Sequence, residues 1–258
     1  MRLVKIFCAA ALLMVASVSA NAEGALKDIL SSGVLKVGTT GDWNPMTMKD
    51  PATNSYKGYD IDVMTELAKD LGVKVEFVPA DWKTLVSGVV SGKYHMTGSA
   101  SLKPSRAKVA GFSTSYFSLA TVPLTMKKNA DKFKDWTDLD KADVTVAATL
   151  GTTQEDQVKR FFPNAKHKIV EAPARDFQEV LAGRADAHIT SNVEAYKLVE
   201  KYPDMMVVPV AQARARTPIA MLLPQDDQVW INFVNTWIQL KSERGFFDQL
   251  GRKWKLSN

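Results

Sequence analysis

Strand-like and helix-like segments alternate along most of this chain, and that alternation constrains its fold more than any other feature. In the first half, strand patterns at 35–40 and 73–78 enclose residues 60–71, whose apolar side chains recur at helical spacing. Strands that alternate with helices in this way favour an α/β fold with mostly parallel strands.

The alternation restarts after about residue 122, with a strand pattern at 144–148 and a helix that runs through Phe161. Two such series predict two lobes, with residues 23–122 and 215–258 in the first and residues 123–214 in the second. Two crossings between lobes are the layout of a hinged cleft. Further strands are expected at 94–98, 168–171, 185–190, 205–210 and 219–223, and further helices at 82–91, 175–181, 192–201, 229–244 and after Gly245.

The first 22 residues have the three parts of a secretory signal peptide: a positive start, the apolar run 6–18 and the small-residue triplet that ends at Ala22. The alternative is an uncleaved anchor, but a membrane span needs about 20 apolar residues. We therefore predict an exported, periplasmic protein that does not span the membrane after cleavage. The only cysteine, Cys8, lies in this segment, so disulfides, thiolate catalysis and cysteine-bound zinc are excluded from the mature chain.

Several other function classes lack support in the sequence. The formal charge is +5 without a run of Lys or Arg, which gives no support for a nucleic-acid or polybasic membrane patch. The three histidines have no metal-ligand spacing, and neither a phosphate loop nor a nucleophile elbow occurs. We expect no metal, no cofactor and no nucleic-acid partner.

Five segments in order resemble the periplasmic solute-binding proteins of polar amino-acid ABC transporters, family 3. They are residues 33–46, 57–72, 97–113, 151–157 and 182–195. The resemblance implies the type II periplasmic-binding-protein fold, with two lobes around a hinged cleft. It also implies a small carboxylate-bearing ligand, such as an amino acid or related organic acid, and a transient ABC permease partner in the inner membrane. Within the family, the segments around Asp42, Trp82 and 193–195 are most similar to the cyclohexadienyl dehydratases, which are periplasmic enzymes on the same scaffold.

Arg106 is the first candidate for ligand contact, because the resemblance implies an arginine here that clamps a carboxylate. A guanidinium offers a planar fork of donors that matches two carboxylate oxygens. Ser99, Ser101 and the backbone amides near Thr97 and Gly98 are expected to complete an anion-binding nest. From the residues alone, the alternative is a surface arginine in a helix N-terminal turn.

Two threonines and two tryptophans are further candidates. Thr152 and Thr153 precede a helix, where a hydroxyl can bind an anion or cap the helix. Trp43 and Trp82 follow strand-like segments and suit the aromatic walls of a ligand cleft, although packing is the ordinary role of tryptophan. Trp230, Trp237 and Trp254 lie at helical spacing and are interpreted as packing residues. 

Glu194 allows three interpretations that position does not separate. By resemblance to the dehydratases it is a general acid that protonates the departing hydroxyl of prephenate or arogenate. It is otherwise a helix N-terminal glutamate favoured by the dipole, or a binding protein's contact to a ligand hydroxyl or ammonium.

Two positions depart from the family pattern. Ser191 stands where amino-acid binders place an aspartate for the α-ammonium, so such a ligand would need Asp42 or Glu194 instead. Thr121 stands where the dehydratases place a lysine. Thr121 counts against the enzyme, whereas export and a resemblance over nearly all of the mature chain support a binding protein, which we favour. The predicted ligand-binding residues are Asp42, Trp43, Trp82, Thr97, Gly98, Ser99, Ser101, Arg106, Thr152, Thr153, Ser191 and Glu194, with Glu194 catalytic only in the enzyme alternative.

Overall fold

The computed structural model describes residues 24–256, so the signal peptide predicted at 1–22 and its Cys8 lie outside the described residues. Among the residues described, no helix is both long enough and apolar enough to cross a bilayer.

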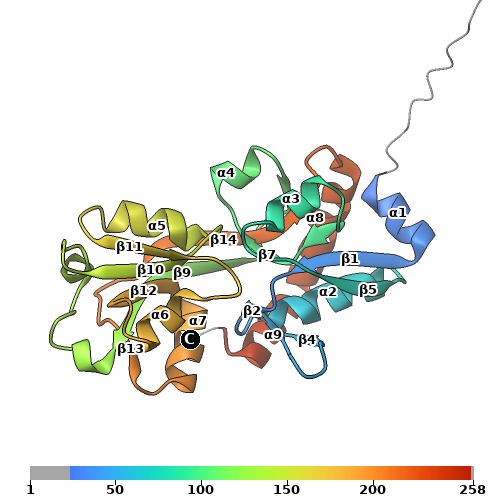
Figure 1. Cartoon of the computed structure of the whole chain (residues 1–258). Coiled ribbons are helices and arrows are strands. Elements are labelled where there is room, and N and C mark those ends of the chain that lie inside the picture. Colours follow the sequence, from blue (N-terminus) through green and yellow to red (C-terminus); the bar gives the residue numbers. More distant parts are fainter. Residues whose placement is uncertain (1–23, 257–258) are drawn as a thin grey trace, which may run out of the picture.

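Helices pack around three sheets (Figure 1). The strands are β1 Val34–Thr39, β2 Asp42–Trp43, β3 Thr47–Lys49, β4 Tyr56–Lys57, β5 Lys74–Pro79, β6 Met96–Thr97, β7 Ser99–Ser101, β8 Gly111–Phe112, β9 Phe117–Met126, β10 Thr145–Thr149, β11 Lys166–Val170, β12 Ala187–Ser191, β13 Met205–Val207 and β14 Arg214–Leu223. The helices are α1 Ala25–Ser32, α2 Tyr59–Asp70, α3 Leu85–Val90, α4 Pro104–Ala107, α5 Thr153–Phe161, α6 Asp176–Leu181, α7 Asn192–Lys201, α8 Gln228–Glu243 and α9 Phe246–Trp254, with short 3₁₀ turns at Lys127–Asn129 and Trp136–Leu139.

Parallel strands form the centre of each lobe. The first lobe is built on the sheet β5-β1-β6, and the second is built on β11-β10-β12, with every pair in these two sets parallel. The βα alternation in the sequence therefore led to the correct α/β class, and the structure has the two-lobed form that was expected.

Two ten-residue strands, β9 and β14, join the lobes and run antiparallel to each other. β9 pairs with β12 of the second lobe, whereas β14 pairs with β7 of the first lobe, so the larger sheet is mixed rather than parallel (Figure 1). The sequence did not predict β9, because the strand contains Pro123 and proline argues against a central strand. The lobe boundaries expected near residues 122 and 214 fall on these two strands and stay a prediction.

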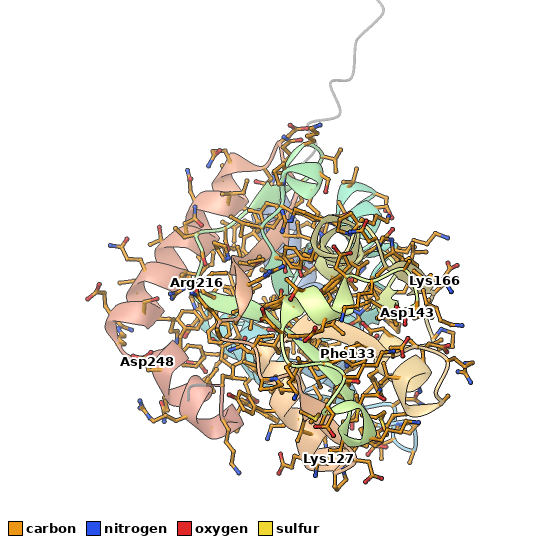
Figure 2. All side chains as sticks on the ribbon, turned by 90° about the vertical axis from the view of Figure 1, so that its left-hand side faces the viewer. Lys127, Phe133, Asp143, Lys166, Arg216 and Asp248 are labelled. Carbon is orange, nitrogen blue, oxygen red and sulfur yellow. The ribbon has the colours of Figure 1, made fainter. Side chains whose placement is uncertain are left out.

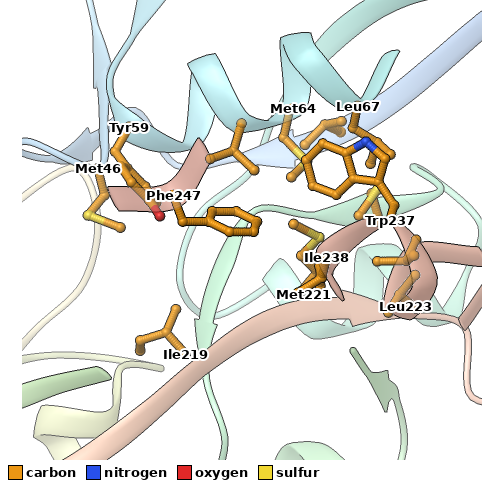
Figure 3. Packing of buried hydrophobic residues seen from close by; sticks show 14 of the residues in the cluster. Met46, Tyr59, Met64, Leu67, Ile219, Met221, Leu223, Trp237, Ile238 and Phe247 are labelled. Atoms are coloured by element: carbon orange, nitrogen blue, oxygen red, sulfur yellow. The ribbon is translucent and has the colours of Figure 1, made fainter. Parts of the chain in front are cut away.

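Each lobe has its own apolar core. In the first, Met64 of α2 packs with Trp237 and Ile238 of α8 over Met221 of β14 (Figure 3). The second core gathers around Phe133 and its neighbours from β10 and β12. Figure 2 looks at the molecule from the second-lobe end, with Lys166 and Asp248 at opposite edges of the outline.

The three tryptophans expected to pack do lie with the first core. Trp230 and Trp237 are buried, and Trp254 is half-buried against the cluster. One helix begins later than the pattern suggested: residues 82–84 form a turn, because the Asp81 carboxylate accepts from the backbone N–H of Thr84 (2.8 Å), and α3 begins at Leu85.

Candidate ligand-binding cleft

A cavity lies between the lobes and collects most of the predicted ligand-binding residues. Its walls are formed by Trp43, Trp82, Ser99, Ser101, Arg106, Leu119, Thr149, Thr152, Thr153, Gln154, Arg175, Asp176, Thr190 and Glu194. Asp42, Thr97, Gly98 and Ser191 do not line it, although Thr97 and Gly98 line a neighbouring cavity inside the first lobe. The structure also adds Arg175 and Asp176, for which the sequence predicted no role.

Arg106 lies in the short helix α4, where its side chain is 4% exposed. Its Nη1 donates to the Ser101 carbonyl (3.3 Å) and its Nη2 donates across the cleft to the Gly151 carbonyl (3.2 Å). Both acceptors are neutral, so burial dominates and lowers the pKa of Arg106 to about 10, with the charge of Asp156 opposing. The cleft therefore contains a buried guanidinium whose charge no carboxylate in residues 24–256 pairs with directly.

At Gly151 the backbones of the two lobes come close together. Its φ is +80°, and a Cβ there would lie 2.6 Å from the Trp82 carbonyl oxygen of the first lobe. Glycine is required on both grounds. This close approach holds the Gly151 carbonyl within reach of Arg106.

The two threonines after Gly151 have different roles. Thr152 is the N-cap of α5, since its hydroxyl oxygen accepts from the N–H of Glu155 (3.3 Å) while the hydroxyl donates to the carbonyl of Thr149 (2.6 Å). The Thr153 hydroxyl is buried and has no hydrogen-bond partner within the described chain. Capping therefore accounts for Thr152 but leaves the Thr153 hydroxyl unused.

The anion nest expected around Ser99 is occupied by a carboxylate of the chain itself. The N–H of Ser99 donates to Asp60 Oδ2 (3.1 Å), and its hydroxyl donates to Oδ1. Burial raises the pKa of Asp60 to about 7 in spite of these two bonds. The Thr97 hydroxyl accepts from the N–H of Leu222 (3.3 Å), so these donors and acceptors support the first lobe rather than the cleft.

Arg175, at the N-cap of α6, connects acids of both lobes. Its Nη2 donates to Glu194 Oε1 (2.9 Å), while its Nη1 donates to the Asp42 carbonyl and lies 3.3 Å from Asp42 Oδ2. Burial lowers its pKa, but the charges of Glu194 and Asp42 outweigh burial and raise it. No motif marks Arg175 in the sequence, where it was interpreted only as the first residue of a helix.

Asp42 and Ser191 are each bound by a tryptophan of the first lobe, and only the bond to Ser191 crosses between the lobes. Trp82 Nε1 donates to Asp42 Oδ1 (3.0 Å), and Trp43 Nε1 donates to Ser191 Oγ (3.3 Å). The two indoles meet edge to face with centroids 5.6 Å apart. Both indoles line the cavity, whereas Asp42 and Ser191, to which they donate, do not.

Glu194 is fully buried at the start of α7. Burial raises the pKa of its carboxyl, against the charge of Arg175 and a hydrogen bond donated by the Thr190 hydroxyl to Oε2. Its own N–H donates to Ser191 Oγ (3.3 Å), which makes Ser191 the N-cap of the helix. Glu194 therefore has the expected helix N-terminal position, while its contact to a ligand stays a prediction, because the contacts seen are to Arg175 and Thr190.

Asp176 lines the cavity, whereas Thr121 of β9 stands where the resemblance to the dehydratases predicted a lysine. The Asp176 Oδ2 atom lies 3.6 Å from His188 Nδ1, and its Oδ1 accepts from the N–H of Phe177 (2.9 Å). Burial raises the pKa of Asp176, but His188 and Arg175 lower it by more. Thr121 donates to the Gln157 side chain (2.9 Å), so no cation stands at that point of β9.

Comparisons with known proteins agree on the family. The chain is 29% identical over 253 residues to the cyclohexadienyl dehydratase of Pseudomonas aeruginosa, covering 98% of this chain and 93% of that protein. The solved structure of an ancestral amino acid-binding protein, AncCDT-1, described as a precursor of cyclohexadienyl dehydratase, superposes with a TM-score of 0.83. It is 38% identical, over 90% of this chain and 99% of that one.

A third comparison is with a transporter component. An amino acid ABC transporter substrate-binding protein from Streptococcus pneumoniae, solved with L-arginine, has a TM-score of 0.82 and 25% identity over 90% of this chain and 98% of that one. The family and these neighbours support a solute-binding protein of the amino-acid-binding kind. The model of the bacterial extracellular solute-binding proteins, family 3, matches residues 35–257, and the chain belongs to that family.

Proposed function

We propose that this protein is the periplasmic solute-binding component of an ABC transporter and that it captures a small carboxylate-bearing solute between its lobes. The observation that carries the proposal is Arg106, a buried guanidinium on the cavity wall whose two hydrogen bonds go to neutral carbonyl groups. A ligand carboxylate would supply the missing negative charge and match the donor fork.

The interlobe contacts explain how binding would stabilise the closed arrangement. Arg106 belongs to the first lobe, whereas Thr153, whose hydroxyl has no partner among residues 24–256, belongs to the second. A carboxylate that accepts from both would contact both lobes. Binding then favours the conformation in which the lobes meet, and the permease partner would recognise that conformation.

Ligand screening with a matched pair of variants tests the proposal. The mature chain, starting at Glu23, would be unfolded and refolded to remove ligand and then screened against amino acids and organic acids by thermal shift. Calorimetry on the best ligand follows. We expect Arg106→Ala to weaken binding by about 100-fold or more, while Arg216→Ala, an exposed arginine outside the cavity, leaves it unchanged. Equal affinity in the Arg106 variant would refute the proposal.

The second candidate function is cyclohexadienyl dehydration, and the burial of Glu194 favours it. A carboxyl whose pKa is raised by desolvation can hold the proton that an acid catalyst needs. Glu194 would transfer that proton to the departing hydroxyl of prephenate or arogenate. The C–O bond then breaks, and water leaves. The ring carboxylate leaves as carbon dioxide, and its bonding electrons complete the aromatic ring.

Product formation separates this candidate from the first. Prephenate and arogenate would be added to the refolded protein while phenylpyruvate and phenylalanine are followed. Turnover that disappears in Glu194→Gln but persists in Glu200→Gln, an exposed glutamate on the same helix, would establish the enzyme. An unmodified protein that produces neither product has only the binding role.

A further inference from the structure

We infer that the cleft selects a hydroxy or oxo carboxylate that carries no ammonium group. The inference rests on the proposed function, because it names the ligand class of the same site. It follows from how the charges and donors of the cavity are already paired. Among the residues that line it, Glu194 pairs with Arg175 and Asp176 lies beside the His188 imidazole, whereas several donors have no acceptor that carries charge.

The acids near the cleft already have partners within the protein. Arg175 binds Glu194 at 2.9 Å and lies 3.3 Å from Asp42 Oδ2. Asp176 has His188 at 3.6 Å and the N–H of Phe177 at 2.9 Å. An ammonium group entering the cavity would have to share Glu194 or Asp42 with Arg175, or share Asp176 with its imidazole and backbone partners.

The donors show the opposite pattern. Within the described part of the chain, Arg106 donates only to the Ser101 and Gly151 carbonyls. The Nε of Arg175, a side chain that lines the cavity and is 8% exposed, is buried without a hydrogen-bond partner in the described chain. The Thr153 hydroxyl is likewise buried without a hydrogen-bond partner among the described residues. Buried donors of this kind gain most from ligand oxygens that accept hydrogen bonds.

These two patterns together define the ligand class. A carboxylate on Arg106 provides negative charge where the chain provides none. A hydroxyl or keto oxygen on the same ligand provides an acceptor for Arg175 Nε. An ammonium group in that position would offer only N–H donors, and the Arg106 guanidinium and Arg175 Nε are donors as well. Leaving a charge desolvated and unpaired lowers affinity by about 100-fold or more.

Ligand sets that share one carbon skeleton give a direct test on the unmodified protein. Suitable sets are L-alanine, L-lactate and pyruvate; L-glutamate, 2-hydroxyglutarate and 2-oxoglutarate; and L-phenylalanine, L-phenyllactate and phenylpyruvate. Calorimetry would measure each dissociation constant. In the set that fits the cavity, we expect the hydroxy or oxo acid to bind at least about 100-fold more tightly than the amino acid.

The outcomes separate this inference from the proposed function. An amino acid that binds as tightly as its hydroxy or oxo counterpart, for instance by sharing Asp176, would overturn the inference and leave a carboxylate-binding protein. If neither these sets nor the wider screen of amino acids and organic acids gave any ligand, the proposed function would fail, and the inference would fail with it.

A variant pair tests whether Arg175 sets the preference. Arg175→Gln frees the Glu194 and Asp42 carboxylates, so the ratio of affinities should move by about 10-fold or more toward the amino acid. Lys83→Gln breaks another interlobe ion pair, Lys83–Glu171 at 2.8 Å, which is exposed and away from the cavity, and should leave the ratio unchanged. An unchanged ratio in folded Arg175→Gln would contradict the role of Arg175. If that variant does not fold, the matched ligands still decide the inference.

Discussion

The cleft contains two buried arginines whose surroundings differ in one decisive respect. Arg106 donates to two neutral carbonyls, and its pKa is lowered to about 10. Arg175 contacts two carboxylates, and its pKa is raised. Both side chains are nearly inaccessible and both reach across the cleft, so neither burial nor position distinguishes them. The distinguishing property is whether the protein itself supplies the counter-charge.

This difference separates a ligand-binding charge from a structural one. An uncompensated buried cation gains when an anion arrives from solution, because the cost of desolvation has already been met in the folded protein. A compensated cation gains little from a further anion and instead keeps two acids in place. Arg106 therefore fits the recognition of a carboxylate, while Arg175 fits the control of what else enters the cavity.

Replacing each arginine by methionine should produce the largest contrast. Arg175→Met leaves Glu194 and Asp42 without their cation, and breaking a buried ion pair from one side costs about 3–5 kcal/mol of unfolding free energy. Arg106→Met leaves no acid without its cation. We therefore expect the unfolding free energy of the ligand-free protein to fall by less than about 1 kcal/mol. Urea unfolding of both variants measures the contrast.

The pH dependence of the Arg175→Met variant identifies the cause of its instability. Without the cation, the folded-state pKa of Glu194 rises further above its unfolded value, so stability falls as pH rises above that unfolded value. The loss should therefore be greater near about pH 8 than near about pH 5. Adding Glu194→Gln should restore most of it. An equal loss at both pH values would show that packing, not charge, had been removed.

The next largest effect is the pH dependence of stability expected from Asp60. This residue is a buried acid without a cation partner within residues 24–256. Burial raises its pKa from 3.8 to about 7 in the folded protein. The folded state therefore binds more protons than the unfolded state between these values, and stability falls as pH rises through that window, with a slope of about 1 kcal/mol per pH unit. Urea unfolding of Asp60→Asn should give a flatter profile over the same range. A slope identical to that of the unmodified chain would mean that Asp60 stays ionised.

Periodicity was sufficient to predict the elements whose stabilising contacts are local. The helix expected at 192–201 is α7 with the same bounds, because Ser191 supplies a local cap and the apolar residues recur at helical spacing. The strand β9 escaped prediction, since it is stabilised by partners far away in the chain and contains Pro123. Local patterns carry little information about such pairings.

The same contrast between local patterns and distant partners applies to the residues of the candidate site. Arg106 was predicted because the family resemblance marks its segment, and it does line the cavity. The role of Arg175 depends on Asp42, which lies 133 positions away in sequence and in the other lobe. The predicted nest at Ser99 could not reveal that Asp60, 39 positions away, already fills it. In both cases the deciding partner is distant in sequence and close only after folding.

The smallest effect is expected at Lys103, which tests whether a charge next to Arg106 also contributes. Lys103 Nζ bridges the lobes to Asp156 Oδ2 at 2.8 Å, but the Asp156 side chain is 60% exposed. Solvent and salt screen such a pair, so Lys103→Gln should weaken ligand binding by no more than about 3-fold, and the difference should vanish at high salt. Calorimetry at low and high ionic strength measures both quantities. A loss as large as that for Arg106→Ala, persisting in salt, would show that the carboxylate is shared between two cations and that Arg106 is not the sole anchor.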